Sequence, residues 1–79
     1  MVSLWWLVYE IDGERFVWIE EACDLASARS TASLHDAPPD AFVEGHRLEP
    51  VIAKKFSETL IGRRISAAEA ARWLRSYRC

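Results

Sequence analysis

Cysteine and glycine are scarce in this chain, and their scarcity argues against several classes of small protein. Cys23 and Cys79 are the only cysteines among 79 residues, which is too few for a disulfide framework, and they lack the spacing of metal ligands. The three glycines form no glycine-rich phosphate loop. No acidic pair is placed for acid-base chemistry. The sequence therefore predicts a protein that is not an enzyme and that carries no cofactor or metal.

The N-terminus also lacks the features of a signal peptide. Residues 1–3 carry no positive side chain, and Glu10 and Asp12 interrupt the apolar run that follows before it could cross a bilayer. We therefore expect a soluble cytoplasmic protein without membrane contact. A length of 79 residues predicts a single small domain, residues 1–79, with one modest core.

The chain is rich in aromatic and β-branched residues between Leu4 and Glu21, with the sequence LWWLVYEIDGERFVWIEE. Two such runs separated by an Asp-Gly pair are typical of a β-hairpin, because Asp and Gly tolerate the positive φ of a type I′ turn. We therefore predict a hairpin with Asp12 and Gly13 at its tip. This turn would place Tyr9 opposite Phe16.

Both faces of this hairpin are apolar. Side chains alternate between the faces of a sheet, so one face would carry Trp5, Leu7, Tyr9, Ile11, Phe16 and Trp18, and the other Leu4, Trp6, Val8, Val17 and Ile19. An antiparallel hairpin with one wet face should instead alternate apolar with polar residues. Two explanations stand: other segments of the chain cover both faces, or one face binds a partner. In the second case the interface residues would be Trp5, Leu7, Tyr9, Phe16 and Trp18.

A helix is expected after the hairpin. Asp24 is a good N-cap, and the helix would direct Leu25, Ala28, Ala32 and Leu34 toward the sheet. Pro38 and Pro39 would end this element. The alternation in residues 41–49 fits a third strand, placed at a sheet edge because of its charges and Gly45.

The end of the chain carries a second helix signal. Pro50 could open a short helical turn, and Gly62 could close another one. Ser66 and Glu69 have the spacing of a capping box, which predicts a helix from this point onward. The expected fold is α+β in the order β-β-α-β-α: a three-stranded antiparallel sheet built on the N-terminal hairpin, with helices on one face.

Charge is distributed unevenly along the chain. Residues 1–44 hold two basic and nine acidic side chains, a net charge of −7, whereas residues 45–79 hold eight basic and three acidic ones, a net charge of +5. Clustered Lys and Arg bind phosphates, and aromatic residues stack on bases. The basic half therefore supports nucleic-acid binding through Lys54, Lys55, Arg63, Arg64, Arg72, Arg75 and Arg78. The alternative is a solvated face that pairs with the acidic hairpin.

The segment LIGRRISAAEAARWL, residues 60–74, carries an Ile-Gly-basic step, a serine cap, a Glu-Ala pair and a leucine. In these features it resembles small bacterial proteins of unknown function and helical modules in the C-terminal parts of bacterial topoisomerases. The resemblance covers about a fifth of the chain, and the zinc-ribbon cysteines that often accompany such modules are absent from it. It implies a bacterial source and contact with nucleic acid, and no activity.

Two polar groupings bear on possible chemistry. Ser33, His35 and Asp36 are too close in sequence to adopt the geometry of a nucleophile, a base and an orienting acid. A metal site could be assembled from His35, Asp36, Asp40, Glu44 and His46, yet the same residues are ordinary polar loop and strand residues.

The function expected from the sequence is that of a non-enzymatic protein-interaction module. We expect it to form a homo-oligomer such as a dimer, or to bind another protein, through the apolar hairpin face. The alternative is a nucleic-acid-binding accessory protein that uses the basic C-terminal half.

Overall fold

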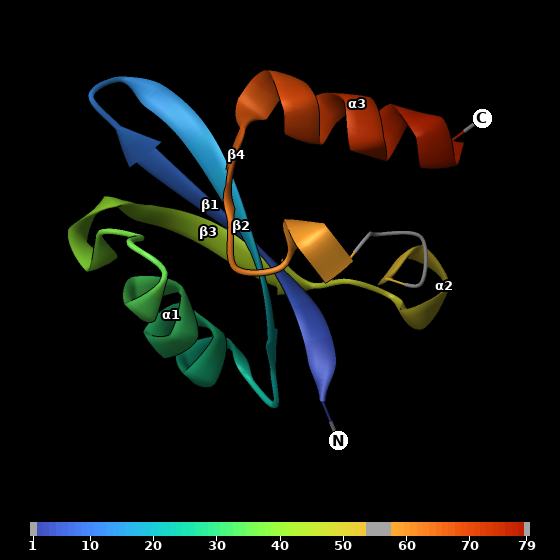
Figure 1. Cartoon of the computed structure of the whole chain (residues 1–79), viewed down its shortest axis with the longest axis horizontal. Coiled ribbons are helices and arrows are strands. Elements are labelled where there is room, and N and C mark those ends of the chain that lie inside the picture. The colour runs from blue at the N-terminus through green and yellow to red at the C-terminus, as the bar shows by residue number, and fades with distance from the viewer. Residues whose placement is uncertain (1, 54–57, 79) are drawn as a thin grey trace.

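The computed structural model describes residues 2–53 and 58–78, and of Ile52, Glu58 and residues 73–78 it describes the backbone alone. Figure 1 shows a twisted sheet with helices on both sides. The elements in chain order are β1 (Ser3–Ile11), β2 (Glu14–Ala22), α1 (Leu25–Leu34), η1 (Pro39–Ala41), β3 (Phe42–Arg47), α2 (Pro50–Ala53), η2 (Glu58–Leu60), β4 (Arg64–Ser66) and α3 (Ala67–Arg78).

The predicted hairpin is confirmed. Asp12 and Gly13 have φ values of 53° and 82°, as a two-residue turn with a right-handed strand twist requires. The register is the expected one, with Tyr9 opposite Phe16. Glu10 and Arg15 lie opposite each other, and their Oε1 and Nε atoms are 3.8 Å apart at the surface. A pair this exposed adds little to stability.

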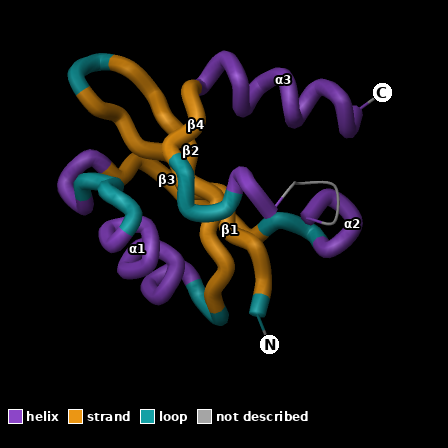
Figure 2. The backbone as a smooth tube through the Cα atoms, viewed as in Figure 1, coloured by secondary structure: helices purple, strands orange, loops and turns teal. Residues whose placement is uncertain are grey.

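The sheet is antiparallel and has four strands in the order β3-β1-β2-β4, so the predicted number of three is wrong. The strand that the sequence did not reveal is β4, which spans only three residues beside β2. Three residues are too few for their alternation to identify a strand, and β4 forms because Ile65 pairs with Val17 and is buried. Figure 2 shows the hairpin strands with one further strand on either side.

The sequence predicted helices on one face of the sheet. This prediction is wrong, because α1 and α3 pack on opposite faces. Ala28 and Ala32 of α1 belong to a core with Leu7 and Trp18, whereas Ala70 of α3 belongs to a second core. The second core contains Trp6, Val8, Val17, Ile19, Leu48, Leu60, Ile65 and Ala70. Helices on opposite sides therefore cover both apolar faces of the hairpin (Figure 1). The fold therefore supports the explanation that other segments of the chain cover both apolar faces of the hairpin.

The N-terminus of α1 is capped as predicted. The Asp24 carboxylate accepts a hydrogen bond of 2.8 Å from the Ser27 amide. Fewer residues of the helix are buried than expected. Ala28 and Ala32 are fully buried, whereas Leu34 is 82 % exposed. Two small residues bring the helix close to the aromatic side chains of the sheet.

The capping residue of α3 is also as predicted, since the Ser66 hydroxyl accepts a hydrogen bond of 3.2 Å from the Glu69 amide. The third strand predicted within residues 41–49 is confirmed as β3. None of the described helices is long and apolar enough to cross a membrane.

Candidate functional site

The outer edge of β3 has no neighbouring strand in the described part of the chain, because β3 ends the sheet on one side. The Leu48 amide donates a hydrogen bond of 2.8 Å to the Leu4 carbonyl of β1. In an antiparallel ladder the backbone groups of successive residues point alternately toward and away from the neighbour. Arg47 and Gly45 therefore direct their amides and carbonyls away from β1. Another strand could pair with these groups.

Two charged or polar side chains flank this edge on the face that also carries Trp6. Glu44 and His46 lie opposite Val8 and Trp6 of β1 and are both exposed. The imidazole of His46 stacks near the Trp6 indole, with 6.4 Å between ring centroids and 25° between planes. Glu44 and His46 thus project from the same face of the edge strand, one residue on either side of Gly45.

The hairpin residues expected at an interface have a different place. Leu7, Tyr9 and Trp18 are 0 %, 0 % and 1 % exposed, because α1 packs over them. Trp5 and Phe16 are half-buried at the margin of the same core. Buried side chains cannot form a contact surface in this fold, so an interface would need other residues. Self-association itself stays a prediction.

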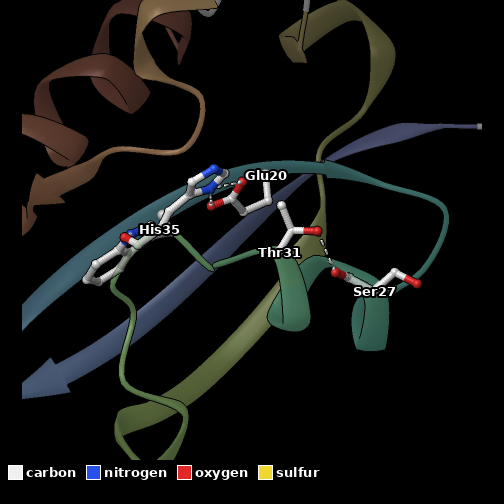
Figure 3. Close-up of polar contacts among 5 residues, drawn as sticks. Glu20, Ser27, Thr31 and His35 are labelled. Atoms are coloured by element: carbon white, nitrogen blue, oxygen red, sulfur yellow. Dashed lines mark hydrogen bonds and ion pairs between the residues drawn. The ribbon is translucent and has the colours of Figure 1, made fainter. Parts of the chain in front are cut away.

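A buried carboxylate is hydrogen-bonded to an imidazole at the end of α1. Glu20 of β2 is fully buried, and its Oε2 and Oε1 atoms lie 2.9 and 3.1 Å from Nδ1 of His35 (Figure 3). The indole Nε1 of Trp18 donates a hydrogen bond of 3.0 Å to the carbonyl of His35. These contacts fix both the backbone and the ring of His35. Its other ring nitrogen, Nε2, is left to contact solvent or a ligand.

The environment of Glu20 has opposing effects on its acidity. Burial raises the pKa of Glu20, and the hydrogen bond and charge of His35 lower it, with burial the larger effect. A carboxylate removed from water is costly unless it is paired. Within the described structure, His35 is the side chain that is hydrogen-bonded to this carboxylate.

A pocket of about 400 Å³ adjoins His35, lined also by Trp18, Asp36, Gly62, Arg63 and Arg64. The Gly62 amide donates a hydrogen bond of 2.9 Å to the Ile19 carbonyl, which attaches this segment to β2. Gly62 has a φ of 75°, and a Cβ there would lie 3.0 Å from Cε1 of His35. Glycine is therefore required both by the backbone and by the imidazole beside it.

The basic residues expected to bind nucleic acid are only partly brought together. Arg63 and Arg64 line one pocket, and Arg72 is exposed on α3. Lys54 and Lys55 lie outside the described residues, and only the backbone of Arg75 and Arg78 is described. The described side chains thus group Arg63 with Arg64 alone, and nucleic-acid binding stays a prediction.

The possible metal ligands are dispersed. Among the residues that the structure describes, no three His, Cys, Asp or Glu side chains could hold a metal ion together. His35 is bound to Glu20, whereas Glu44 and His46 project from β3. The described residues give no reason to assign a metal.

Comparison with protein-family models, curated proteins and solved structures found no match to this chain. Function must therefore be inferred from the geometry of the β3 edge and of the pocket beside His35.

Sequence reasoning missed the Glu20–His35 pair, although one signal pointed to it. The predicted register places Glu20 opposite Trp5, on the face of the hairpin that carries Leu7 and Trp18. A charge in that position requires a buried partner. The identity of the partner was not predictable, because His35 is 15 residues away and reaches Glu20 only when α1 packs on the sheet.

We expect Glu20→Gln to alter the pH dependence of stability. In the folded protein the pKa of Glu20 is above its ordinary value of 4.5, so the folded state binds more protons than the unfolded state between these two values. Stability contributed by the protonated form is present below about pH 4 and is lost as the pH rises through the folded pKa. Because glutamine cannot ionise, the Glu20→Gln variant does not lose stability in this way as the pH rises. The wild type should therefore lose stability relative to the variant toward neutral pH.

Urea unfolding at about pH 4, 5.5 and 7 measures this difference. The two proteins should be most alike at the lowest pH, where Glu20 is mostly neutral in both states. A wild type that gains on the variant as the pH rises would contradict the assigned direction of the pKa.

Proposed function

We propose that this protein is a non-enzymatic interaction module that self-associates by pairing the free edges of β3. The single observation that supports this proposal is the free edge of β3. Its outward backbone groups are unpaired within the described chain, and its exposed Glu44 and His46 can each face the other residue in a second copy. The contact is assigned to the edge of the sheet because both faces of the hairpin are covered.

The arrangement of β3 selects one register. Two antiparallel copies related by a two-fold axis at Gly45 would place the outward amide and carbonyl of Gly45 opposite those of the second Gly45. Those of Arg47 would lie opposite Val43 of the second copy, where the register of β3 against β1 shifts. Glu44 would then lie opposite the partner's His46 in a pair without backbone hydrogen bonds, where side chains are closest. Symmetry provides this carboxylate–imidazole pair twice. Centring the axis on Glu44, His46 or Arg47 would instead place two identical charged or polar side chains opposite each other.

A second copy of the chain suits this edge better than an unrelated apolar strand. Charged side chains on an edge strand usually prevent promiscuous pairing. Here Glu44 and His46 disfavour an apolar partner but attract each other across the two-fold axis. The other edge of the sheet, β4, is only three residues long and leads directly into α3. The proposed pairing would join two four-stranded sheets into one continuous sheet.

We expect Glu44→Lys to weaken self-association about tenfold, because two cross-strand pairs at roughly 0.7 kcal/mol each are replaced by unfavourable ones. Sedimentation equilibrium over a concentration series measures the association constant. The double variant Glu44→Lys/His46→Glu places unlike charges opposite each other again and should recover association.

Glu21→Lys is the matched control, since it makes the same change of charge at an exposed position of β2. It should associate like the wild type, and circular dichroism should show that all variants are folded. A wild type that remains monomeric at every concentration would refute the proposal. So would a Glu44→Lys variant whose association equals that of the control.

A further inference from the structure

The pocket between the end of α1 and the segment that precedes β4 combines cationic side chains with a fixed imidazole. Its volume is about 400 Å³, and its lining includes His35, Arg63 and Arg64. We propose that this pocket binds the phosphate group of a phosphate monoester. The proposal does not depend on self-association, because the pocket adjoins β4 and the proposed contact is on β3, at the opposite edge of the sheet.

The two arginines supply the principal anion-binding groups. Both are exposed and both line the pocket. The guanidinium of Arg64 lies over the Phe16 ring, with 4.7 Å from Cζ to the ring centroid, so the aromatic face supports one side of the group. A guanidinium presents a planar set of N–H donors that matches phosphate oxygens in pairs. Two adjacent arginines can bind different oxygens of one phosphate.

His35 is oriented for the same purpose. Its Nδ1 lies 2.9 Å from Oε2 of Glu20, so Nε2 is the ring nitrogen left for a ligand, and it donates when the ring carries a proton on both nitrogens. Glu20 is fully buried behind the ring and is already paired with it, which limits repulsion of an anion in the pocket. The carbonyl of His35 is held by the Trp18 indole, and the absence of a side chain at Gly62 leaves room for the ring.

The balance of charge favours a doubly negative ligand. Arg63 and Arg64 supply positive charge, whereas Asp36 is the acidic residue that lines the pocket with them, and Glu20 is hydrogen-bonded to His35. Asp36 offsets one of the two arginines, so the arginines and Asp36 together leave a net positive charge of about one, which attracts a doubly negative group more strongly than a singly negative one. A phosphate monoester carries nearly two negative charges at neutral pH, and a backbone phosphodiester carries one. The monoester therefore gains more from these groups.

The test is a titration of ¹⁵N-labelled full-length protein with inorganic phosphate, followed by nuclear magnetic resonance at constant ionic strength. We expect saturable shifts of the Gly62, Arg63 and Arg64 amides and of the Trp18 indole N–H. The double variant Arg63→Gln/Arg64→Gln should bind at least tenfold more weakly while its remaining spectrum stays unchanged. Arg15→Gln, at an exposed position of the hairpin, is the matched control and should bind normally.

A second titration distinguishes a phosphate monoester from a backbone phosphodiester. A dinucleotide with a 5′-phosphate should bind, and the same dinucleotide without it should bind at least tenfold more weakly. Equal binding of the two would contradict the assignment to a monoester. Shifts that grow linearly without saturation, or that persist undiminished in the double variant, would overturn the site itself. Loss of phosphate binding would leave the association of β3 unaffected, so the two proposals can fail independently.

Discussion

Trp18→Ala is expected to lower the free energy of unfolding by about 3–5 kcal/mol, the largest effect among the substitutions considered. Trp18 is 1 % exposed and lies between the sheet and α1. Its ring contacts Tyr9 edge to face, with 5.0 Å between centroids and 72° between planes. The substitution would remove this contact and leave a cavity beneath Ala28 and Ala32, which are too small to fill it.

The same substitution removes a polar contact. The indole Nε1 of Trp18 donates to the carbonyl of His35 at 3.0 Å and so connects the core to the end of α1. Trp18→Phe keeps an aromatic ring but loses this donor, and we expect a smaller loss of about 1–3 kcal/mol. The measurement is urea unfolding followed by circular dichroism at low protein concentration, where self-association does not contribute.

The paired variants keep this prediction testable if Trp18→Ala does not fold, because the graded loss in Trp18→Phe still reports on the core. A loss below about 1 kcal/mol for the alanine variant would contradict the placement of Trp18 in the core.

Gly45→Ala is expected to be the second large effect, with a loss of about 1–3 kcal/mol. A Cβ at this position would lie 2.8 Å from Cδ1 of Leu25 and 2.8 Å from Cδ2 of Leu7. Leu7 is fully buried, so close packing leaves the end of its side chain little room to shift. Alanine restricts the unfolded chain more than glycine does, which offsets about 0.5–1 kcal/mol of this loss. Overpacking remains the larger effect.

Leu25→Ala provides the test of mechanism. In a background with the shorter side chain, one of the two close contacts disappears, so Gly45→Ala should cost roughly half as much as in the wild type. Urea unfolding of the four proteins measures this coupling. Equal costs in both backgrounds would show that Leu25 does not limit the space at Gly45.

The elements that the sequence predicts best are those specified by local chemistry. The hairpin follows from Asp12 and Gly13, whose positive φ sets the register of both strands. The N-caps Asp24 and Ser66 are equally local, because each side chain bonds an amide three residues ahead. Local signals of this kind do not depend on how distant parts of the chain pack.

The features that escaped prediction depend on contacts between distant segments. β4 forms because Ile65 pairs with Val17, and its three residues are too few to form a recognisable strand pattern. The placement of α3 on the face opposite α1 also follows from packing, since its alanines fit either face. The composition of the hairpin indicated that both faces must be covered or bound, but not which segment covers each face.

The candidate sites show the same division. Glu44 and His46 were recognised as polar residues of an edge strand, yet their complementarity about Gly45 requires the pairing of β3 with β1 to be known. Arg63 and Arg64 were recognised as basic residues, whereas their position beside His35 depends on the turn at Gly62. The candidate residues were visible in the sequence, and their grouping was not.

The most direct test of the proposed self-association is amide hydrogen exchange across a range of protein concentrations, followed by nuclear magnetic resonance. The amides of Gly45 and Arg47 point away from β1, so they should exchange rapidly in dilute protein and become protected as concentration rises. The amides of Glu44 and His46 point toward β1 and should be protected throughout. Rapid exchange of Gly45 and Arg47 at every concentration, in a sample that nevertheless associates, would contradict pairing through β3.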